Sequence, residues 1–345
     1  MVPKPFLLDA PGTLPKLYSM NEILIVGRSL VRQLLPLDQC IGLMERAFRA
    51  ASDGSAVQGL RGITPVRGGA GGVLGVMPGG LTEPPRFGVK VISVLHGRSA
   101  QSHQGGVLLF DAADFAPLAL IHAGEVTAIR TAAATAVATR VLARKDARVL
   151  AVLGTGEQAE THIRALALVR QWDEVRVWGR SQAKARSLVD TIGEAAGCTV
   201  RIADSVAAAV GGAGVICTVT ASATPILTAD MIEPGMHLNL VGASVASARE
   251  VDSAAVARAS MFVDHEAMAR SAGGEFIAAL QEGAIGSGHI RGELGAVLLS
   301  RVAGRQSDDE VTIVKSLGMP VEDLFAADFI YAAARKLGLG TTAPF

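Results

Sequence analysis

The chain has 345 residues, enough for one large domain or two of ordinary size. Half of its residues are hydrophobic, and its 32 lysine and arginine residues equal its 32 aspartate and glutamate residues without forming a basic cluster. This balance argues against nucleic acid or an anionic membrane as a partner. No apolar run in the sequence reaches membrane-spanning length.

The three cysteines, Cys40, Cys198 and Cys217, have neither disulfide nor metal-ligand spacing, and the seven histidines form no ligand pattern. We therefore expect a reduced, cytoplasmic protein without a metal site. Residues 1–20 contain four prolines and lack the hydrophobic core of a signal peptide, which indicates a loose extension.

The first third of the chain predicts an α+β domain. A short strand is expected at 23–26, followed by a helix that opens at Leu35-Pro36, carries one apolar stripe and ends by Gly54. The remaining elements are strands at 59–66, 73–77 and 87–95, a hairpin that joins 107–110 to 118–121, and a helix at 125–142. Mostly antiparallel strands in this region argue for a unit separate from the rest of the chain.

A glycine-rich turn marks the start of a second domain. The apolar run 149–153 predicts a buried strand, and Gly154-Thr155-Gly156-Glu157-Gln158-Ala159 comes directly after it. A helical pattern and a second strand at 175–178 complete a βαβ unit. The first glycine permits the tight turn, the second lets the backbone approach a pyrophosphate, and the closing alanine allows close helix packing. Because the helix start also offers free N–H groups and its positive dipole end, the motif predicts dinucleotide binding.

The end of the second strand indicates which dinucleotide binds. An NAD site usually carries Asp or Glu there, which hydrogen-bonds the ribose 2′-hydroxyl. This chain has Gly179-Arg180-Ser181 and then Lys184, with no carboxylate. A guanidinium suits a 2′-phosphate through its planar fork. We therefore expect Arg180, Ser181 and Lys184 to favour NADPH, with NADH as the other candidate, unless Arg180 is an ordinary surface side chain.

Alternating helices and strands continue after this unit. Helices are predicted at 182–196 and 206–210, and strands at 199–202, 214–218, 237–241 and 261–263. With the two strands of the βαβ unit this makes six, the number typical of a doubly wound parallel sheet. Two helices within 273–303, a strand at 311–314 and a helix at 320–337 close the chain. The predicted fold class is α/β, a Rossmann domain beside a smaller α+β domain.

Three cations of the first domain are candidates for a cleft between the domains. Lys90 lies in the apolar strand 87–95, where a buried ammonium is costly without an anion. Arg130 has almost no polar neighbour in the sequence, and Arg61 opens a strand beside glycines. Each residue taken singly also fits a structural role, and spacing alone does not show whether they converge.

The carboxyl ends of two Rossmann strands are the expected place for the reactive end of the cofactor. Val241-Gly242-Ala243-Ser244 ends one strand, where Gly242 would let the nicotinamide ring approach and Ser244 could contact substrate. Thr218-Val219-Thr220 ends another strand and could line the ribose. Both segments also fit plain turns.

Several separate stretches, in the same order, resemble the ornithine cyclodeaminase/mu-crystallin family from about residue 22 to 337. They are Met77-Pro78, Gly88-Val89-Lys90, the hairpin 106–121, the segment 125–133, the turn 154–159, the strand end 241–244, and the segments 315–319 and 321–324. The resemblance implies a homodimer in which the C-terminal segment returns to the first domain. The substrate-binding and dimerisation domain would then span 1–132 and 319–345, and the Rossmann domain 133–318.

The resemblance also implies roles for single residues. Arg61, Lys90 and Arg130 would hold the α-carboxylate and the adjacent nitrogen of a substrate, with Met77 beside them, and Thr131 would lie near the cofactor. Ornithine cyclodeaminases and the related alanine dehydrogenases have Asp where this chain has Ser244. Oxidation of an amino acid needs a base for the ammonium proton, whereas an imine that arrives protonated accepts hydride without one. Ketimine reductases of the family resemble this chain at the same position.

We therefore expect an NAD(P)H-dependent reductase of cyclic α-imino acids, which would convert Δ1-pyrroline-2-carboxylate to proline and Δ1-piperideine-2-carboxylate to pipecolate. Arg61, Lys90, Arg130 and Ser244 would form a cationic site that requires no Asp or Glu beside the reacting carbon. One alternative keeps the fold and reverses the chemistry, as an ornithine cyclodeaminase or an NAD-dependent amino-acid dehydrogenase. The other is a non-catalytic crystallin-like protein that binds NADPH and a small ligand.

Overall fold

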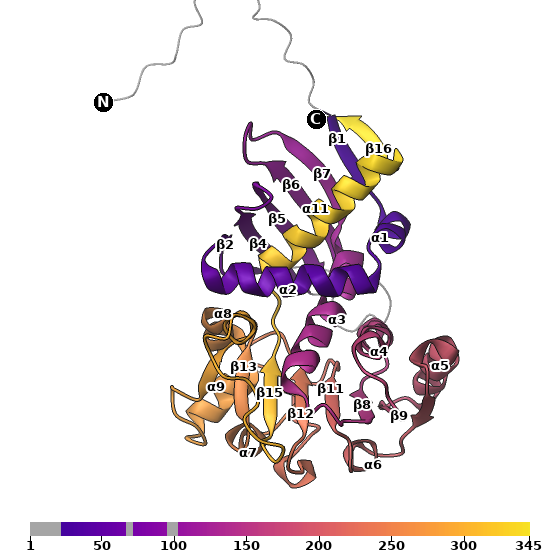
Figure 1. Ribbon diagram of the computed structural model, residues 1–345, viewed down its shortest axis with the longest axis vertical. Helices are drawn as coiled ribbons and strands as arrows, with labels where there is room; N and C mark the ends of the chain where they lie inside the picture. The colour runs from indigo at the N-terminus through magenta and orange to yellow at the C-terminus, as the bar shows by residue number, and fades with distance from the viewer. Residues whose placement is uncertain (1–21, 67–71, 95–102) are drawn as a thin grey trace, which may run out of the picture.

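The computed structural model describes residues 22–66, 72–94 and 103–345, and these residues form two eight-stranded sheets. The sheets lie one above the other along the long axis of the molecule (Figure 1). The N-terminal extension expected at 1–20 and the last residue of the strand predicted at 87–95 lie outside the described residues. No helix in the described ranges combines the length and the apolar character that a membrane span needs.

The upper sheet is mostly antiparallel, as the sequence predicted for the first domain. Its strands lie in the order β16-β1-β7-β6-β5-β4-β2, with β3 paired to β4 and with β1 and β7 parallel. Helices α2 and α11 cross one face of this sheet (Figure 1). The predicted apolar stripe of α2, which includes Cys40, Met44 and Phe48, is buried, and α2 packs mainly on α3, α10 and α11. Gly54, in the left-handed conformation, ends α2.

The elements of this part are β1 (Glu22–Val26), α1 (Arg28–Leu34), α2 (Leu37–Asp53), β2 (Ala56–Gln58), β3 (Gly62–Val66), β4 (Gly72–Leu81), β5 (Arg86–Val94), β6 (His103–Asp111), β7 (Pro117–His122), α11 (Pro320–Leu337) and β16 (Thr341–Pro344).

The lower sheet is parallel and has helices on both faces, as a doubly wound fold requires. Its strands lie in the order β10-β9-β8-β11-β12-β15-β13-β14. Along β8, Leu150 and Val152 face the core that α4 and α5 share, whereas Ala151 and Leu153 face the core of α6, α7 and α9. The glycine turn after β8 therefore lies at the carboxyl edge of the sheet.

The elements of this part are β8 (Val149–Leu153), α4 (Glu157–Val169), β9 (Glu174–Trp178), α5 (Gln182–Ile192), η1 (Gly193–Ala196), β10 (Thr199–Ile202), α6 (Val206–Val210), β11 (Val215–Thr218), η2 (Ala229–Met231), β12 (His237–Leu240), α7 (Ser253–Ala257), β13 (Ser260–Val263), α8 (Glu266–Ala272), α9 (Gly274–Gln281), β14 (Ile290–Glu293), α10 (Leu294–Leu298) and β15 (Thr312–Lys315).

The expectation of six strands for this sheet was wrong, because the described sheet has eight. Strand β15, which the sequence predicted apart from the alternating units, is inserted between β12 and β13. Strand β14 was missed, as were α7 and α8 here and α1 and β16 in the upper part. These elements have only four to seven residues, too few for a hydrophobic period to define them.

Helix α3 (Ala123–Leu142) joins the two sheets. Almost all of its residues are buried, and its small side chains let α2, α4 and α11 pack against it. One hydrophobic core therefore continues from the upper sheet into one face of the lower sheet. After β15 the chain crosses back, α11 packs on the upper sheet and β16 pairs with β1. We propose the division 1–132 and 319–345 against 133–318, with its first boundary inside α3.

Candidate functional site

The glycine turn between β8 and α4 has the shape that a bound pyrophosphate needs. Gly154 has a φ of +137°, and a Cβ atom there would lie 2.8 Å from the carbonyl oxygen of Val219. Gly156 precedes the first residue of α4, is exposed and has open space where a Cβ would point. Ala159 is fully buried against the core. The turn therefore fits close approach of a phosphate to the backbone.

The first turn of α4 leaves donors for such a ligand. The N–H groups of Glu157 and Gln158 donate no hydrogen bond to any residue that the structure describes, and helix geometry leaves these first amides without partners inside the helix. The side-chain oxygen of Gln158 is likewise buried without a partner among the described residues. Thr155, between the two glycines, has its methyl group 2.5 Å from where a Cβ of Gly179 would lie. The end of β9 is thus packed directly against the glycine turn.

The residues expected to recognise the 2′-phosphate lie at this edge. Arg180 and Lys184 are exposed where β9 leads into α5, and Ser181 caps α5 by accepting a hydrogen bond from the Lys184 N–H at 3.4 Å. No carboxylate occupies the end of β9, so the position where an NAD site carries its acid holds a cation instead.

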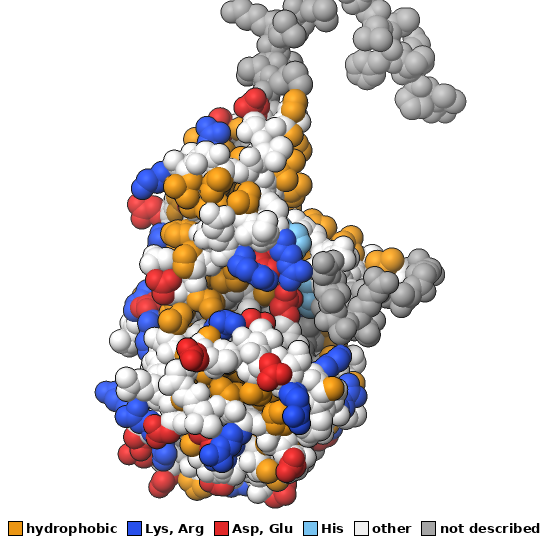
Figure 2. Space-filling view, turned by 90° about the vertical axis from the view of Figure 1, so that its right-hand side faces the viewer, with side chains coloured by type: hydrophobic (Ala, Val, Ile, Leu, Met, Phe, Trp, Pro, Cys, Tyr) orange, Lys and Arg blue, Asp and Glu red, His pale blue; other side chains and the backbone are white. Residues whose placement is uncertain are grey.

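Arg28 of α1 links the upper part of the molecule to the glycine turn. Its guanidinium lies 2.8 Å from Glu125 and 2.5 Å from Glu157, the fourth residue of the glycine motif. Arg32 contacts Glu125 from the same helix at 2.8 Å. Figure 2 shows Lys or Arg side chains beside acidic ones at about this height of the molecule. This link was not predicted from the sequence, because α1 itself was not predicted.

The strand ends expected near the nicotinamide are organised by Glu250, a residue that no sequence motif singled out. One carboxylate oxygen accepts from the Thr220 N–H and hydroxyl at 2.8 and 2.7 Å. The other accepts from the Thr218 hydroxyl and the Gly242 N–H, each at 2.7 Å. Burial raises the pKa of Glu250, while Lys315 and these donors oppose the rise. Glu250 therefore ties the ends of β11 and β12 together.

This arrangement changes the expected roles at those strand ends. Thr218 is fully buried with its hydroxyl on Glu250, so it supports the site from behind instead of lining it. Gly242 has no room for a Cβ, which would lie 2.1 Å from the Thr220 carbonyl oxygen. Val219 is buried against Gly154, whereas Val241 and Thr220 are only half-buried. Backbone and small side chains thus form this edge.

Lys90 points from β5 into the space between the upper sheet and α11. Its ammonium lies 2.7 Å from Asp323 and donates to the Thr127 hydroxyl at 3.3 Å. The side chain is 3% exposed, and Met77 is its register partner on β4. Burial lowers the pKa of Lys90 to about 8, although the charge of Asp323 favours the protonated form. A lysine with this pKa can donate a proton near neutral pH.

Arg130 reaches the same point from α3. Its Nη1 lies 2.6 Å from Glu322, and its Nε lies 3.2 Å from Asp323. Burial disfavours the guanidinium charge, but the charges of Asp323 and Glu322 outweigh burial and raise the pKa of Arg130. No described residue accepts a hydrogen bond from Nη2. Thr131 comes after Arg130 in the helix and is also buried.

Arg61 closes the cluster from the loop before β3. Its Nη1 donates to the Ser244 carbonyl oxygen at 3.4 Å, and its Nη2 donates to the carbonyl oxygen of Leu317. Burial first, and then the charge of Arg130, lower the pKa of Arg61. The carboxylate of Asp264 accepts from the Leu317 N–H at 2.5 Å, which fixes the loop that Arg61 holds. Arg61 therefore connects the first domain to the end of β12.

Arg61, Lys90 and Arg130 thus lie together in the structure, which their spacing in the sequence could not show. Ser244 lies beside Arg61, and its side chain is exposed. The sequence analysis named no acid for this cluster, and the structure places Glu322 and Asp323 within it as partners of Arg130 and Lys90. A signal for them existed in the sequence, since a lysine and an arginine in apolar surroundings require anions. What the sequence did not show was which acids would supply them.

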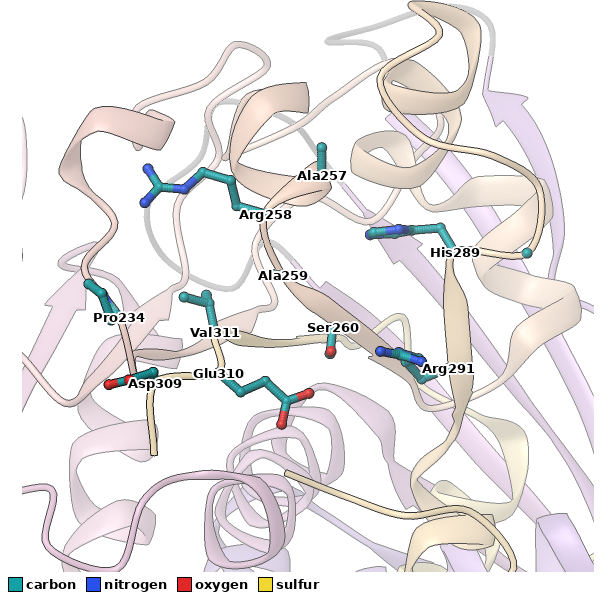
Figure 3. A pocket seen from close by; sticks show the side chains of 11 residues that line it. Pro234, Ala257, Arg258, Ala259, Ser260, His289, Arg291, Asp309, Glu310 and Val311 are labelled. Carbon is teal, nitrogen blue, oxygen red and sulfur yellow. The ribbon is translucent and has the colours of Figure 1, made fainter. Parts of the chain in front are cut away.

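A cavity of about 550 Å³ lies elsewhere, at the amino edge of the lower sheet (Figure 3). It is lined by residues before or at the start of β13, β14 and β15, among them Arg258, His289, Arg291 and Glu310. It contains none of the residues predicted for substrate or cofactor. Its lining carries charges of both signs, and we assign it no part in the chemistry.

Comparison with known proteins agrees with this architecture. The sequence profile of the ornithine cyclodeaminase/mu-crystallin family matches residues 22–337. The chain is 34% identical to the mouse ketimine reductase mu-crystallin over 321 residues, 92% of this chain and 96% of the relative. The solved Δ1-pyrroline-2-carboxylate reductase of Thermococcus litoralis, in complex with NADH and L-proline, is 31% identical with a TM-score of 0.89, covering 92% of this chain and 99% of that chain.

An archaeal alanine dehydrogenase dimer with bound NAD is 28% identical, with a TM-score of 0.87, and the alignment covers 94% of this chain and 99% of that one. Reductases of imines and dehydrogenases of amino acids therefore share this fold. The profile match covers nearly the whole described chain, so the chain belongs to the ornithine cyclodeaminase/mu-crystallin family.

Proposed function

We propose that this protein is an NAD(P)H-dependent reductase of cyclic α-imino acids. The observation that carries the proposal is the convergence of Arg61, Lys90 and Arg130 from three separate segments. Lys90 and Arg130 meet at Asp323. Arg61 lies close enough for its charge to act on Lys90, and it donates to the carbonyl oxygen of Ser244. The names of the mouse and Thermococcus relatives support the same substrate class. Δ1-Pyrroline-2-carboxylate and Δ1-piperideine-2-carboxylate, whose reduction gives proline and pipecolate, combine a carboxylate with an adjacent C=N bond.

The N–H groups of the cluster that have no described acceptor form a binding site for the substrate carboxylate. Nη2 of Arg130 has no protein acceptor among the described residues, and Nε of Arg61 is buried without one. A carboxylate held between these two guanidinium groups would have a fixed orientation. Such positioning can contribute roughly 7–11 kcal/mol to lowering a barrier at the extreme. In this arrangement C2 of the ring would face the carboxyl edge of the Rossmann sheet.

Lys90 is then placed to donate a proton to the substrate nitrogen. The reduced cofactor, when bound, supplies the hydride that forms the new C2–H bond, and the π electrons of the C=N bond become the nitrogen lone pair. An imine that arrives protonated already carries its N–H bond, and one that arrives neutral requires a proton. The Lys90 ammonium, held by Asp323 at 2.7 Å, can donate that proton. Met77, opposite Lys90, would pack against the ring.

Ser244 favours reduction over the reverse chemistry. Amino-acid oxidation requires a base for the ammonium proton, and a serine hydroxyl near neutral pH cannot act as one. Within the cluster, Asp323 and Glu322 each pair with a cation, and Glu250 beside Gly242 is held by donors from the ends of β11 and β12. The alternatives, ornithine cyclodeaminase or alanine dehydrogenase activity, and ligand binding without turnover, therefore have less support.

We propose NADPH as the preferred reductant. Arg180 and Lys184 are exposed at the edge where the ribose 2′-phosphate would lie, and β9 ends without a carboxylate. Two similar solved structures contain NADH and NAD, which lack this phosphate, so NADH is the second candidate. We place the reaction in the cytoplasm, which fits the three free cysteines.

We also propose that the protein is a homodimer that pairs through the open face of the upper sheet. Helices cover one face of this sheet, whereas Ile25, Val91 and Leu120 point to the other and are 38–41% exposed. Figure 2 shows many hydrophobic side chains on this upper part of the molecule. Exposed apolar patches of this kind mark association surfaces. Replacing Val91 and Leu120 by glutamate should give monomers in analytical ultracentrifugation, and an unchanged dimer would exclude this face.

One set of assays tests the activity. NADPH oxidation is followed with the five-membered and the six-membered imine, and ammonia release from ornithine with NAD⁺ is followed in parallel. We expect turnover of the imines and none of ornithine. Ammonia release without imine reduction would establish the cyclodeaminase alternative, and binding of NADPH without either reaction would establish the non-catalytic one.

A matched pair of variants connects the activity to the cluster. Arg130→Lys keeps a cation but loses the guanidinium fork, and we expect kcat/KM to fall by several powers of ten. Arg86→Lys is the control, because Arg86 also pairs with two carboxylates, Asp111 and Asp328, but lies outside the cluster. If Arg130→Lys loses less than tenfold, Arg130 does not bind the substrate.

A further inference from the structure

The cation cluster already contains its own counterions before any substrate enters. Arg61, Lys90 and Arg130 contribute three positive charges, and Asp264, Glu322 and Asp323 contribute three negative charges when all are ionised. An entering carboxylate therefore adds a negative charge to a buried cluster that was balanced. Such an excess charge is costly away from water unless a proton accompanies it.

One oxygen in this cluster is ready to accept a proton. Glu322 is fully buried; its Oε2 lies 2.6 Å from Arg130, and its Oε1 has no hydrogen-bond partner among the described residues. An ionised carboxylate oxygen without a donor is costly in such a place, whereas a protonated one is not. Oδ2 of Asp323 also lacks a hydrogen-bond partner among the described residues, but it forms an ion pair with Lys90 at 2.7 Å, and Asp264 accepts from backbone N–H groups.

We propose that Glu322 takes up a proton when a substrate with an uncharged nitrogen enters the site as a monoanion. This inference rests on the proposed function and adds a positioning residue to it, because Glu322 acts through Arg130 and not on the reacting atoms. Protonation would weaken the hold of Glu322 on Nη1 of Arg130 and leave more of the guanidinium for the substrate carboxylate. The proton that the reduction of a neutral imine consumes is donated by Lys90, and the proton on Glu322 offsets the charge of the substrate carboxylate.

The surroundings of Glu322 set the pH at which this occurs. Burial raises the pKa of Glu322 to about 7, although Arg130 opposes the rise. Glu322 is therefore largely ionised in the free enzyme above pH 7 and already protonated well below it. The titratable and charged groups around it are Arg61, Lys90, Arg130, Asp264, Asp323 and the buried thiol of Cys40. Lys90 titrates near pH 8, so the test belongs between these two values.

The experiment measures protons taken up on binding. Pyrrole-2-carboxylate is a planar analogue that binds as a monoanion and cannot accept hydride. Its binding to the NADPH complex is followed by calorimetry at pH 7.5 in two buffers of different ionisation enthalpy. We expect uptake of about half to three-quarters of a proton, because a carboxyl group with a pKa of about 7 is already about one-quarter protonated at pH 7.5. L-Proline, which binds as a zwitterion with no net charge, should take up none.

Two variants identify the acceptor. Glu322→Gln should bind pyrrole-2-carboxylate with almost no proton uptake, whereas Asp328→Asn, on the same helix but paired with Arg86, should behave as the wild type. Uptake that persists in Glu322→Gln would place the proton on Lys90 or Asp323 and overturn the proposal. No uptake by the wild type would overturn it as well.

A measurement on the unaltered protein covers the case in which Glu322→Gln fails to fold. Infrared difference spectra of the NADPH complex, with and without pyrrole-2-carboxylate, should show a carboxylate band lost and a carboxylic-acid C=O band gained. Absence of that exchange would refute the inference. If the enzyme reduces the imines but takes up no proton, only this inference fails; if it does not reduce them, the proposed function fails first.

Discussion

Asparagine in place of Asp323 would test how the cluster maintains the charge of Lys90. Asp323 lies 2.7 Å from the Lys90 ammonium and 3.2 Å from Nε of Arg130, and its side chain is 1% exposed. The substitution keeps the size of the side chain and removes its charge. Lys90 would then face Arg61 and Arg130, both cationic, without its nearest anion.

The magnitude can be worked from the contact that is lost. A buried hydrogen bond to a charged group contributes about 1.5–3 kcal/mol, and one pH unit in a pKa corresponds to about 1.4 kcal/mol. Asp323→Asn should therefore lower the pKa of Lys90 from about 8 to roughly 6–7. Because the protonated ammonium is the active form in the proposed reaction, activity is lost as pH rises through this pKa. The alkaline limb of the kcat/KM profile should move to lower pH by one to two units, roughly.

The assay is imine reduction with saturating NADPH between about pH 5.5 and 9.5. Removing one partner of a buried ion pair costs about 3–5 kcal/mol of stability, a large share of the roughly 5–15 kcal/mol by which a folded protein is stable. Thermal unfolding must therefore first show that the variant is folded at the assay temperature. Asp328→Asn, which removes a carboxylate from the same helix at Arg86, is the matched control and should leave the limb in place.

The reasoning would be refuted by a variant whose activity falls while its alkaline limb stays at the wild-type pH. Asp323 would then act through structure alone, and the limb would belong to another group. A limb that moves to higher pH would contradict the sign of the argument.

Three further changes test the cofactor and the direction of the reaction. Arg180→Ala should raise the KM for NADPH about 10- to 100-fold, which corresponds to the loss of a hydrogen bond to a charged group, and it should leave the KM for NADH within about threefold. The control is Arg201→Ala, at an exposed arginine on the neighbouring strand β10, which should change neither KM. Equal effects on both cofactors would show that Arg180 does not recognise the 2′-phosphate. Gly154→Ala should weaken NADPH binding at least about tenfold in a fluorescence titration, because φ is +137° at Gly154 and the new Cβ would collide with Val219. Gly193→Ala, which is also at positive φ but has open space around it, should bind NADPH normally. Ser244→Asp should slow imine reduction and raise the rate of L-proline oxidation with NADP⁺ at alkaline pH, since it supplies a base; an unchanged ratio of the two rates would show that Ser244 does not set the direction.

Local sequence determined the elements that have a strong pattern. Strand β8 was predicted with its true bounds, as was α11, because a continuous apolar run and an amphipathic period each define a long element. The glycine turn was equally clear, since the positive φ of Gly154 is a requirement of the backbone that few other residues meet. The fold class and the dinucleotide turn were therefore readable from the chain alone.

Only the tertiary structure decided how the cations are balanced and what lies behind the strand ends. A lysine or arginine in apolar surroundings shows that an anion must be present, but the chain has 32 acidic residues, and the two that pair with Arg130 lie 192 and 193 positions away. Glu250 was equally hidden, because its donors come from two strand ends that only the sheet brings together. Local patterns reflect interactions between near neighbours in the chain, whereas charge neutralisation in a buried site depends on which distant segments fold against each other.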